Sequence, residues 1–228
     1  MIPKIIHQSY KTVEHPYPRI WQQSWVEAHA DWIYRFYTDA DNRQIVNDNF
    51  PQYLGPFDAF PKGIMRADFS RFLYMYLWGG VYVDLDYVCL KPCDILLAKS
   101  DPIGIPELPQ NRHYRYHNAL LISESENPFW LKCADRSMQY FMSAKPARAE
   151  WLAGPFRIQA AIKSERPRFV SLSMPDVTPI DWFSCNSNFG KVNKEIVDLR
   201  RKLRSGSIDD MRKAFPDAYA LTFWEHRW

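Results

Sequence analysis

The stretch at residues 64–92, IMRADFSRFLYMYLWGGVYVDLDYVCLKP, constrains the fold most, because two hydrophobic periodicities meet in it. Its first half repeats apolar residues at helical spacing, and a Gly-Gly pair then ends the helix. In its second half apolar and polar residues alternate, as they do in a strand. The pattern predicts a helix, a sharp reversal and a strand that carries Asp84 and Asp86 on one face beside Tyr82.

On an extended strand the carboxylates of Asp84 and Asp86 lie roughly 6 to 7 Å apart, close enough to repel each other. A hard divalent ion relieves that repulsion, and carboxylate oxygens suit Mg²⁺ or Mn²⁺, which also bind the phosphates of nucleotides. Acids with one residue between them are also common in solvated turns. The position of this pair at the end of an apolar strand favours a functional site over a solvated turn.

The rest of the chain reads as alternating strands and helices, which predicts one α/β domain over residues 1–228 with a mostly parallel sheet flanked by helices. A length of 228 residues with 46% apolar content supports one substantial core and not comfortably two. Further strands are expected at 2–9, 32–37, 102–105, 119–123, 169–172 and 177–180.

Composition excludes some functions. The formal charge of +3 is too small to indicate nucleic-acid binding, and 16% aromatic residues suit pockets that stack on bases and sugars, although aromatic residues also fill cores. The four cysteines have no metal-site spacing, so buried thiols are expected.

No apolar run is long enough to span a bilayer, and the first residues do not resemble a signal peptide, so a cytoplasmic location is expected. Basic residues within 191–203 are expected to form a solvated face. Peripheral contact with an anionic membrane surface is the weaker alternative.

The pattern R-A-D-x-x-R, an apolar helix, G-G-V-Y-x-D-x-D and L-K-P resembles the glycosyltransferases that carry a DXD sugar-binding region. That family includes yeast initiating α-mannosyltransferases, bacterial transferases of capsule and lipopolysaccharide biosynthesis and, more distantly, clostridial glucosylating toxins. The resemblance covers roughly the first ninety residues well. It implies a GT-A-type fold, Mn²⁺ or Mg²⁺, and retaining transfer of a hexose from a UDP- or GDP-sugar to a glycan or other hydroxyl acceptor.

The same resemblance assigns roles within residues 64–92. Asp68 and Arg71 would contact the ribose, phosphate or sugar of the donor, and Tyr82 would line the same pocket. Asp84 would bind donor hydroxyls, and Asp86 would bind the metal ion. Arg71 or a nearby lysine would also add to the stabilisation of the leaving diphosphate. Arg71, Asp84 and Asp86 form the expected catalytic set.

Outside that stretch, the resemblance places Tyr10 against the donor base and Trp228 over the donor. Asn118 is either near the transferred sugar or a plain turn residue. The serine and histidine of the family's final segment are replaced here, which leaves the remaining metal ligand open between Glu225 and His226; we favour His226, because imidazole is acceptable to Mn²⁺.

Two other classes of protein remain compatible with these residues. A metal-dependent phosphohydrolase or nucleotidyltransferase also uses spaced acids with Mg²⁺. A non-catalytic module that binds nucleotide-sugars or glycans would use the same pocket without turnover.

Overall fold

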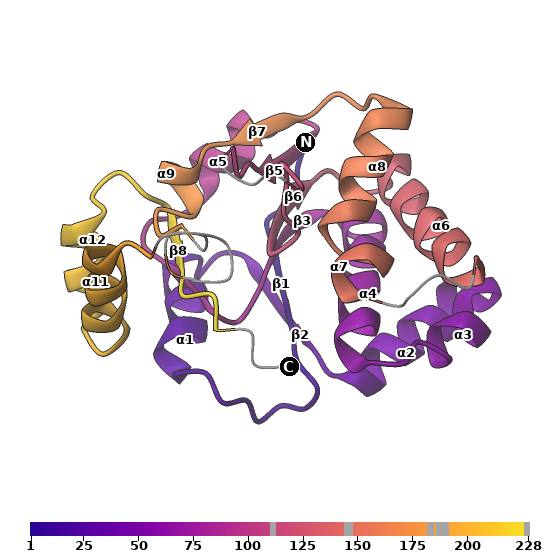
Figure 1. Cartoon of the computed structure of the whole chain (residues 1–228), viewed down its shortest axis with the longest axis horizontal. Coiled ribbons are helices and arrows are strands. Elements are labelled where there is room, and N and C mark those ends of the chain that lie inside the picture. Colours follow the sequence, from indigo (N-terminus) through magenta and orange to yellow (C-terminus); the bar gives the residue numbers. More distant parts are fainter. Residues whose placement is uncertain (110–112, 144–147, 182–184, 186–191, 226–228) are drawn as a thin grey trace.

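The main sheet brings strands from distant parts of the sequence together in the order β2-β1-β3-β6-β5-β7 (Figure 1). The computed structural model describes residues 1–109, 113–143, 148–181, 185 and 192–225. The strands of the main sheet are β1 (Ile5–Ser9), β2 (Ile33–Tyr37), β3 (Gly80–Val83), β5 (Ile103–Pro106), β6 (Leu120–Ser123) and β7 (Val170–Leu172). Strand β1 is parallel to β2 and β3, and β5 is parallel to β7, whereas β6 is antiparallel to both of its neighbours. The predicted α/β fold with a mostly parallel sheet is confirmed.

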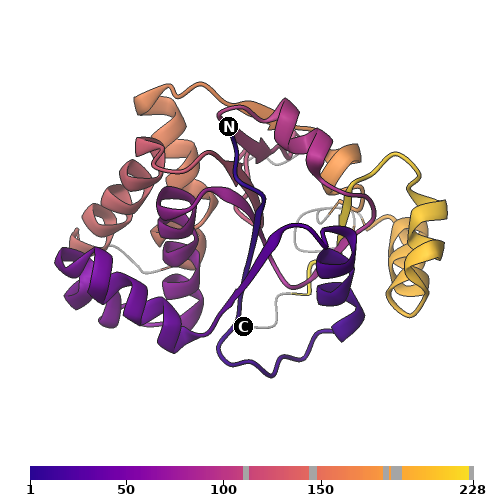
Figure 2. The ribbon, with the colours of Figure 1, turned by 180° about the vertical axis from the view of Figure 1, so that it is seen from behind.

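Helices cover both faces of this sheet, as the two opposite views show (Figures 1 and 2). On one face, α2, α3, α4, α6 and α8 pack on Tyr82 and Leu121 of the central strands. On the other face, Trp25 of α1 and Leu96 of α5 pack on Val81 and Val83. The helices are α1 (Arg19–Ala28), α2 (Asp39–Asn49), α3 (Pro51–Asp58), α4 (Gly63–Leu77), α5 (Asp94–Lys99), α6 (Pro128–Met142), α7 (Ala149–Leu152), α8 (Pro155–Glu165), α9 (Met174–Val177), α11 (Lys194–Arg204) and α12 (Ile208–Ala214).

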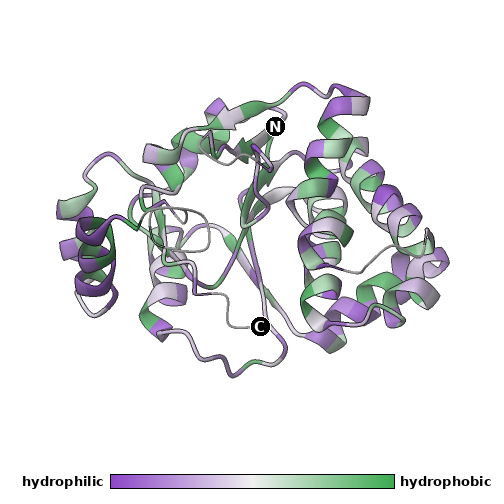
Figure 3. Ribbon diagram, viewed as in Figure 1, coloured by the Kyte–Doolittle hydropathy of each residue, from purple (hydrophilic) through white to green (hydrophobic). Residues whose placement is uncertain are grey.

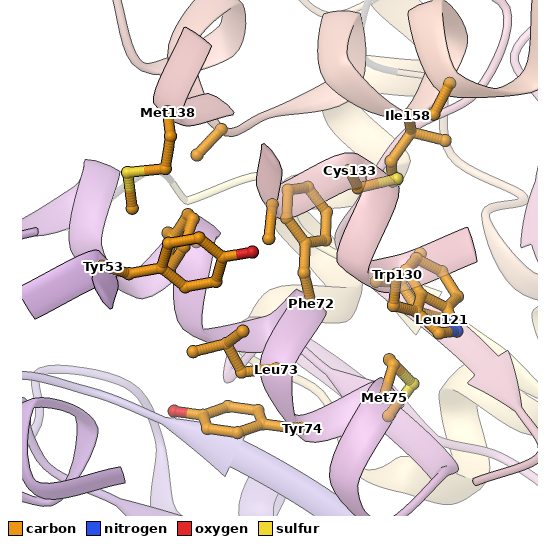
Figure 4. Packing of buried hydrophobic residues seen from close by; sticks show 14 of the residues in the cluster. Tyr53, Phe72, Leu73, Tyr74, Met75, Leu121, Trp130, Cys133, Met138 and Ile158 are labelled. Carbon is orange, nitrogen blue, oxygen red and sulfur yellow. The ribbon is translucent and has the colours of Figure 1, made fainter. Parts of the chain in front are cut away.

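Helix α4 is the centre of the larger core. Figure 4 shows Phe72 and Leu73 of α4 among side chains that include Trp130 and Cys133 of α6 and Ile158 of α8. All five of these side chains are fully buried. Burial of this kind contributes about 1.5 to 3 kcal/mol for each large apolar side chain, so α4 is fixed on the sheet before any ligand is bound.

The predicted glycine reversal joins α4 to β3. Gly79 has a φ of +61° and Gly80 a φ of +88°, a backbone region that residues with a side chain rarely adopt. A Cβ atom at Gly80 would lie 2.4 Å from the carbonyl oxygen of Ile5 in β1. The reversal therefore requires glycine, and it sets α4 directly beside the strand that leads to Asp84.

A smaller two-stranded sheet lies beside the main one and consists of β4 (Tyr87–Cys89) and β8 (Ala220–Thr222) in antiparallel pairing. Leu203 of α11, Met211 of α12 and Phe223 share a buried cluster with Val88 of β4. Figure 3 shows α11 as mainly hydrophilic outside that cluster, in contrast to the apolar central strands. Across the described ranges, none of the helices combines the length and apolar character that a membrane crossing requires.

Two strand predictions were wrong in detail. The strand expected to continue through Asp86 ends at Val83, and residues 84–86 form a turn before β4. The strand expected at 177–180 is absent from that stretch, where α9 ends at Val177. In both places the chain leaves the sheet, which alternation of apolar residues alone does not reveal. The single-domain organisation of residues 1–228 stays a prediction.

Candidate active site

A cavity of about 650 Å³ opens where β1 and β3 end and β6 begins. In α/β proteins the loops at the carboxyl ends of parallel strands are the usual place for a ligand. Residues from both sides of the sheet line it: Ser9, Tyr10, Tyr17, Lys62, Ile64, Asp68, Arg71, Asp84, Leu85, Asp86, Tyr114, His117, Asn118, Ala119, Arg148, Ala149, Glu150, Pro155 and Trp224. Asp68, Arg71, Asp84 and Asp86 therefore share one cavity, as the sequence predicted.

Arg71 lies between two of these acids. Its Nη2 atom is 2.8 Å from Oδ1 of Asp68 and 3.2 Å from Oδ1 of Asp84, and its Nη1 atom donates to the carbonyl oxygen of Asn118 at 2.6 Å. The side chain of Arg71 is only 1% exposed. A cation buried to this degree needs such partners, so Arg71 and the two acids form one ion-paired unit in which a single cation serves two carboxylates.

Two further residues complete this unit. The amide Nδ2 of Asn118 donates to Oδ1 of Asp68 at 2.9 Å, which places Asn118 within this cluster. Tyr82 donates its hydroxyl to Oδ1 of Asp84 at 2.6 Å, and its ring lies 4.5 Å from the Arg71 guanidinium. Tyr82 is fully buried and does not line the cavity, so the structure places it beneath Asp84 rather than on the cavity wall.

The turn at 84–86 holds Asp86 differently from Asp84. The carboxylate of Asp86 accepts a hydrogen bond from the backbone N–H of Glu225 at 2.8 Å, and its backbone carbonyl accepts from the N–H of Phe223 at 3.0 Å. The N–H of Asp84 donates to the carbonyl of Ala119 at 2.8 Å. The two acids thus point into one cavity from a turn that β6 fixes on one side and the C-terminal segment on the other.

The surroundings of Asp68 and Asp86 raise the pKa values of both carboxyl groups. Burial raises the pKa of Asp68 to about 6, and the charge of Arg71 opposes that rise. Burial and then the charge of Asp84 raise the pKa of Asp86 to about 7, which the Glu225 N–H only partly offsets. Asp86 is therefore a carboxyl in need of positive charge, whereas Asp84 already shares Arg71.

This arrangement fits a divalent ion that is held jointly with a substrate. Within the described residues, no cluster of three or more His, Cys, Asp or Glu side chains could hold a metal alone. A magnesium or manganese ion bound with substrate phosphates needs only one or two carboxylates from the protein. The raised pKa of Asp86 and its place on the cavity wall match that requirement.

The two predicted residues at the C-terminus, His226 and Trp228, lie outside the described residues. Glu225, the alternative ligand, is described. Its carboxylate accepts from Nε of Arg204 at 2.6 Å and from Nη2 of the same residue at 3.2 Å. Glu225 is thus engaged with α11, and it reaches Asp86 through its backbone.

Tyr10 lines the cavity, and its contact with the donor base stays a prediction. His7, on the strand β1 that ends just before Tyr10, lies in the core instead. Its Nε2 atom is 2.8 Å from the Gly79 carbonyl, which can only accept, so Nδ1 accepts from the Tyr37 hydroxyl at 2.9 Å. Burial lowers the pKa of His7 to about 3, and the residue stays neutral and structural.

Several lining residues were missed by the sequence analysis. His117 precedes Asn118 and stays neutral, because burial and then Arg71 lower its pKa to about 3. Its Nδ1 accepts from the Ala119 N–H at 3.2 Å, which leaves the proton on Nε2. Trp224 packs edge-on against His117. The adjacency of His117 to Asn118 was the available signal, but nothing in the sequence indicated Lys62, Arg148 or Glu150.

This chain is similar to known glycosyltransferases. Residues 19–104 match the family model described as glycosyltransferase sugar-binding region containing DXD motif. The chain is 35% identical over 144 residues to inositol phosphoceramide mannosyltransferase 2 of Schizosaccharomyces pombe, covering 58% of this chain and 41% of that protein. It is 33% identical over 150 residues to mannosyl phosphorylinositol ceramide synthase SUR1 of Saccharomyces cerevisiae, covering 62% and 36%. The chain thus spans about two fifths or less of these relatives.

A solved structure shares the fold. The PaToxG glycosyltransferase has a TM-score of 0.57 and 14% identity to this chain, with coverage of 94% of this chain and 79% of that one. The match confirms the GT-A-type fold. The family match and the two relatives confirm the resemblance to glycosyltransferases that the DXD pattern predicted. Residues 19–104 of this chain match the glycosyltransferase sugar-binding region, and Asp84 and Asp86 are the D-x-D pair within that match.

Proposed function

We propose that this chain transfers a hexose from a UDP- or GDP-sugar to a hydroxyl group of a glycan or glycolipid acceptor, with Mn²⁺ or Mg²⁺ as cofactor. One observation carries the proposal. The two acids of a single turn line one cavity, and Asp84 is balanced by Arg71, whereas burial and the nearby charge of Asp84 raise the pKa of Asp86 to about 7. Such a site favours additional positive charge at Asp86.

Each acid then has a separate task. Asp86 would hold the ion, which when bound would neutralise the charge that develops on the leaving diphosphate. Asp84 would accept hydrogen bonds from the sugar hydroxyls, since Tyr82 and Arg71 fix its orientation. Arg71 is bonded to two carboxylates and a carbonyl, so its task is to fix Asp68 and Asp84 and to add positive charge beneath the donor.

Other cavity residues suggest where the rest of the substrates bind. The rings of Tyr10 and Tyr17 line the cavity and meet edge to face at 5.8 Å, a surface on which a nucleobase can stack. Lys62 and Arg148 are exposed residues of the same cavity and offer positive charge to an anionic acceptor. The relatives are named for mannose transfer to inositol phosphoceramide, so mannose and phosphoinositol-containing acceptors are the first to test.

A donor panel tests the proposal. The protein is incubated with Mn²⁺ and a set of UDP- and GDP-sugars, and release of nucleoside diphosphate is measured with and without acceptor. We expect one donor to be hydrolysed slowly and to react faster with acceptor, with the anomeric configuration retained. Asp86→Asn should remove this turnover while the fold is kept.

The other outcomes point to different functions. Release of nucleoside monophosphate or inorganic phosphate, independent of the sugar, would indicate a phosphohydrolase or nucleotidyltransferase. Tight binding without turnover of any donor would indicate a non-catalytic module. The cytoplasmic location stays a prediction.

A further inference from the structure

The C-terminal segment at residues 223–225 lies between helix α11 and the DXD turn. On one side, its backbone N–H groups at Phe223 and Glu225 donate to the carbonyl and the carboxylate of Asp86. On the other side, it is bonded to two arginines of α11. The segment is therefore the physical connection between α11 and the acid that the proposed function assigns to the metal ion.

The two arginines bind different parts of the segment. Arg204 holds the Glu225 carboxylate with two hydrogen bonds, at 2.6 and 3.2 Å. Arg200 donates to the carbonyl oxygen of Phe223 from Nε at 2.7 Å and also from Nη2, and its Nη2 atom lies 3.7 Å from Glu225. The Glu225 side chain is only 7% exposed, so these are partly desolvated, charge-assisted contacts rather than solvated surface pairs.

The backbone of the segment needs such support. Trp224 has a φ of +51°, in the left-handed region that residues with a side chain rarely adopt. Its indole Nε1 donates to the Ile180 carbonyl at 2.8 Å, and Phe223 stacks on Trp21 at 4.6 Å. The left-handed turn at Trp224 lets the N–H groups on either side of it both reach Asp86.

We propose that Arg200 and Arg204 of α11 are positioning residues for Asp86, which act by holding residues 223–225 against the DXD turn. Neither arginine lines the cavity, so each acts through the segment: Arg200 through the Phe223 carbonyl and Arg204 through the Glu225 carboxylate. The proposal rests on the proposed function only in taking Mn²⁺ as the ligand of Asp86. The contacts within the protein can be tested without any ligand.

The first test uses NMR to measure the rate of amide hydrogen exchange at Phe223 and Glu225. The wild type is compared with the double variant Arg200→Gln/Arg204→Gln. We expect both amides to exchange faster by about an order of magnitude, because the segment loses the contacts that close it on Asp86. The matched control is Arg201→Gln/Lys202→Gln, which removes the same charge from exposed positions of the same helix. It should leave both rates unchanged.

The second test is Mn²⁺ affinity, measured from the electron paramagnetic resonance signal of free Mn²⁺ in the presence of GDP or UDP. The Arg200→Gln/Arg204→Gln variant should bind Mn²⁺ about tenfold more weakly, as is typical when groups that orient a metal ligand are removed. The conservative single variant Arg204→Lys should lose less Mn²⁺ affinity than the double variant. The Arg201→Gln/Lys202→Gln control should match the wild type. Thermal unfolding of each variant shows whether the fold is kept.

The outcomes separate this inference from the proposed function. Unchanged exchange at Phe223 and Glu225 in the folded Arg200→Gln/Arg204→Gln protein would overturn the positioning role. Faster exchange with unchanged Mn²⁺ affinity would overturn it as well, since the segment would then not position Asp86. A wild-type protein that binds no Mn²⁺ with either nucleotide would contradict both the proposed function and the role assigned to the arginines, whereas weaker binding in the double variant alone supports both.

Discussion

Asp84 and Asp86 are two residues apart in one turn, yet their surroundings differ in kind. Asp84 belongs to a buried unit in which Arg71, Tyr82 and a second acid, Asp68, satisfy one another. Asp86 is held by backbone N–H groups from the other end of the chain, and its pKa is raised to about 7 by burial and by Asp84. The comparison shows that the protein supplies a cation for one acid of the D-x-D pair and only backbone N–H groups for the other.

The largest expected effect comes from removing Arg71, the cation that Asp68 and Asp84 share. Arg71→Met leaves the buried Asp68 and the partly buried Asp84 without their shared cation, so the free energy of unfolding should fall by about 3 to 5 kcal/mol. Arg43→Met is the matched control, because Arg43 pairs with Asp58 in an exposed position, with side chains 54% and 41% exposed. Its loss should be below about 1 kcal/mol. Urea unfolding measures both, and equal losses would contradict the account of Arg71.

The pH dependence of the free energy of unfolding tests the environment of Asp86. The folded-state pKa of Asp86 lies above its unfolded value, so ionisation costs stability, and the cost is complete above about pH 7. At pH 8, Asp86→Asn should therefore be more stable than the wild type by about 2 kcal/mol. This is roughly half of the free energy that corresponds to the full pKa shift, because the Asp86 carboxyl is partly exposed and solvent screens it. At pH 4 this advantage should vanish.

Unfolding in urea at pH 8 and at pH 4 checks this prediction. If Asp86→Asn were less stable than the wild type at pH 8, Asp86 would already have its compensating charge within the protein. The contrast with Asp84 would then be wrong.

A smaller effect is expected at the hydroxyl of Tyr82. Tyr82→Phe removes one hydrogen bond to Asp84 but leaves the ion pair with Arg71, so stability should fall by about 1 kcal/mol and donor affinity by a few fold. Tyr53→Phe is the control, since Tyr53 makes a similar hydrogen bond to Asp135 away from the cavity. That variant should lose similar stability with no change in donor affinity, as calorimetric titration would show. A donor affinity of Tyr82→Phe equal to that of the wild type would argue against an orienting role.

Much of this site could be predicted from local sequence patterns. The helical period before the Gly-Gly pair and the alternation after it located α4 and β3, and they placed Asp68, Arg71 and Asp84 in one cavity. These relations depend on residues close in the chain, where periodicity and glycine chemistry are informative.

The remainder depends on contacts that no local pattern records. Asp86 and Glu225 are 139 residues apart, and their hydrogen bond requires the turn after Val83 that the sequence analysis interpreted as strand. His117 and Arg200 belong to no recognisable sequence motif. Only the fold brings His117 to the cavity and Arg200 to the Phe223 carbonyl. The family resemblance placed Tyr82 on the cavity wall, and strand alternation shows which face a side chain is on but not how deeply it is buried.

Calorimetric titration of Mn²⁺ in the presence of GDP or UDP tests the central claim most directly, with the wild type, Asp86→Asn and Tyr82→Phe compared at pH 8. The account predicts that the wild type binds Mn²⁺, that Tyr82→Phe binds it nearly as well, and that Asp86→Asn binds it roughly a hundredfold more weakly or not at all. Equal Mn²⁺ affinity in folded Asp86→Asn and the wild type would contradict it.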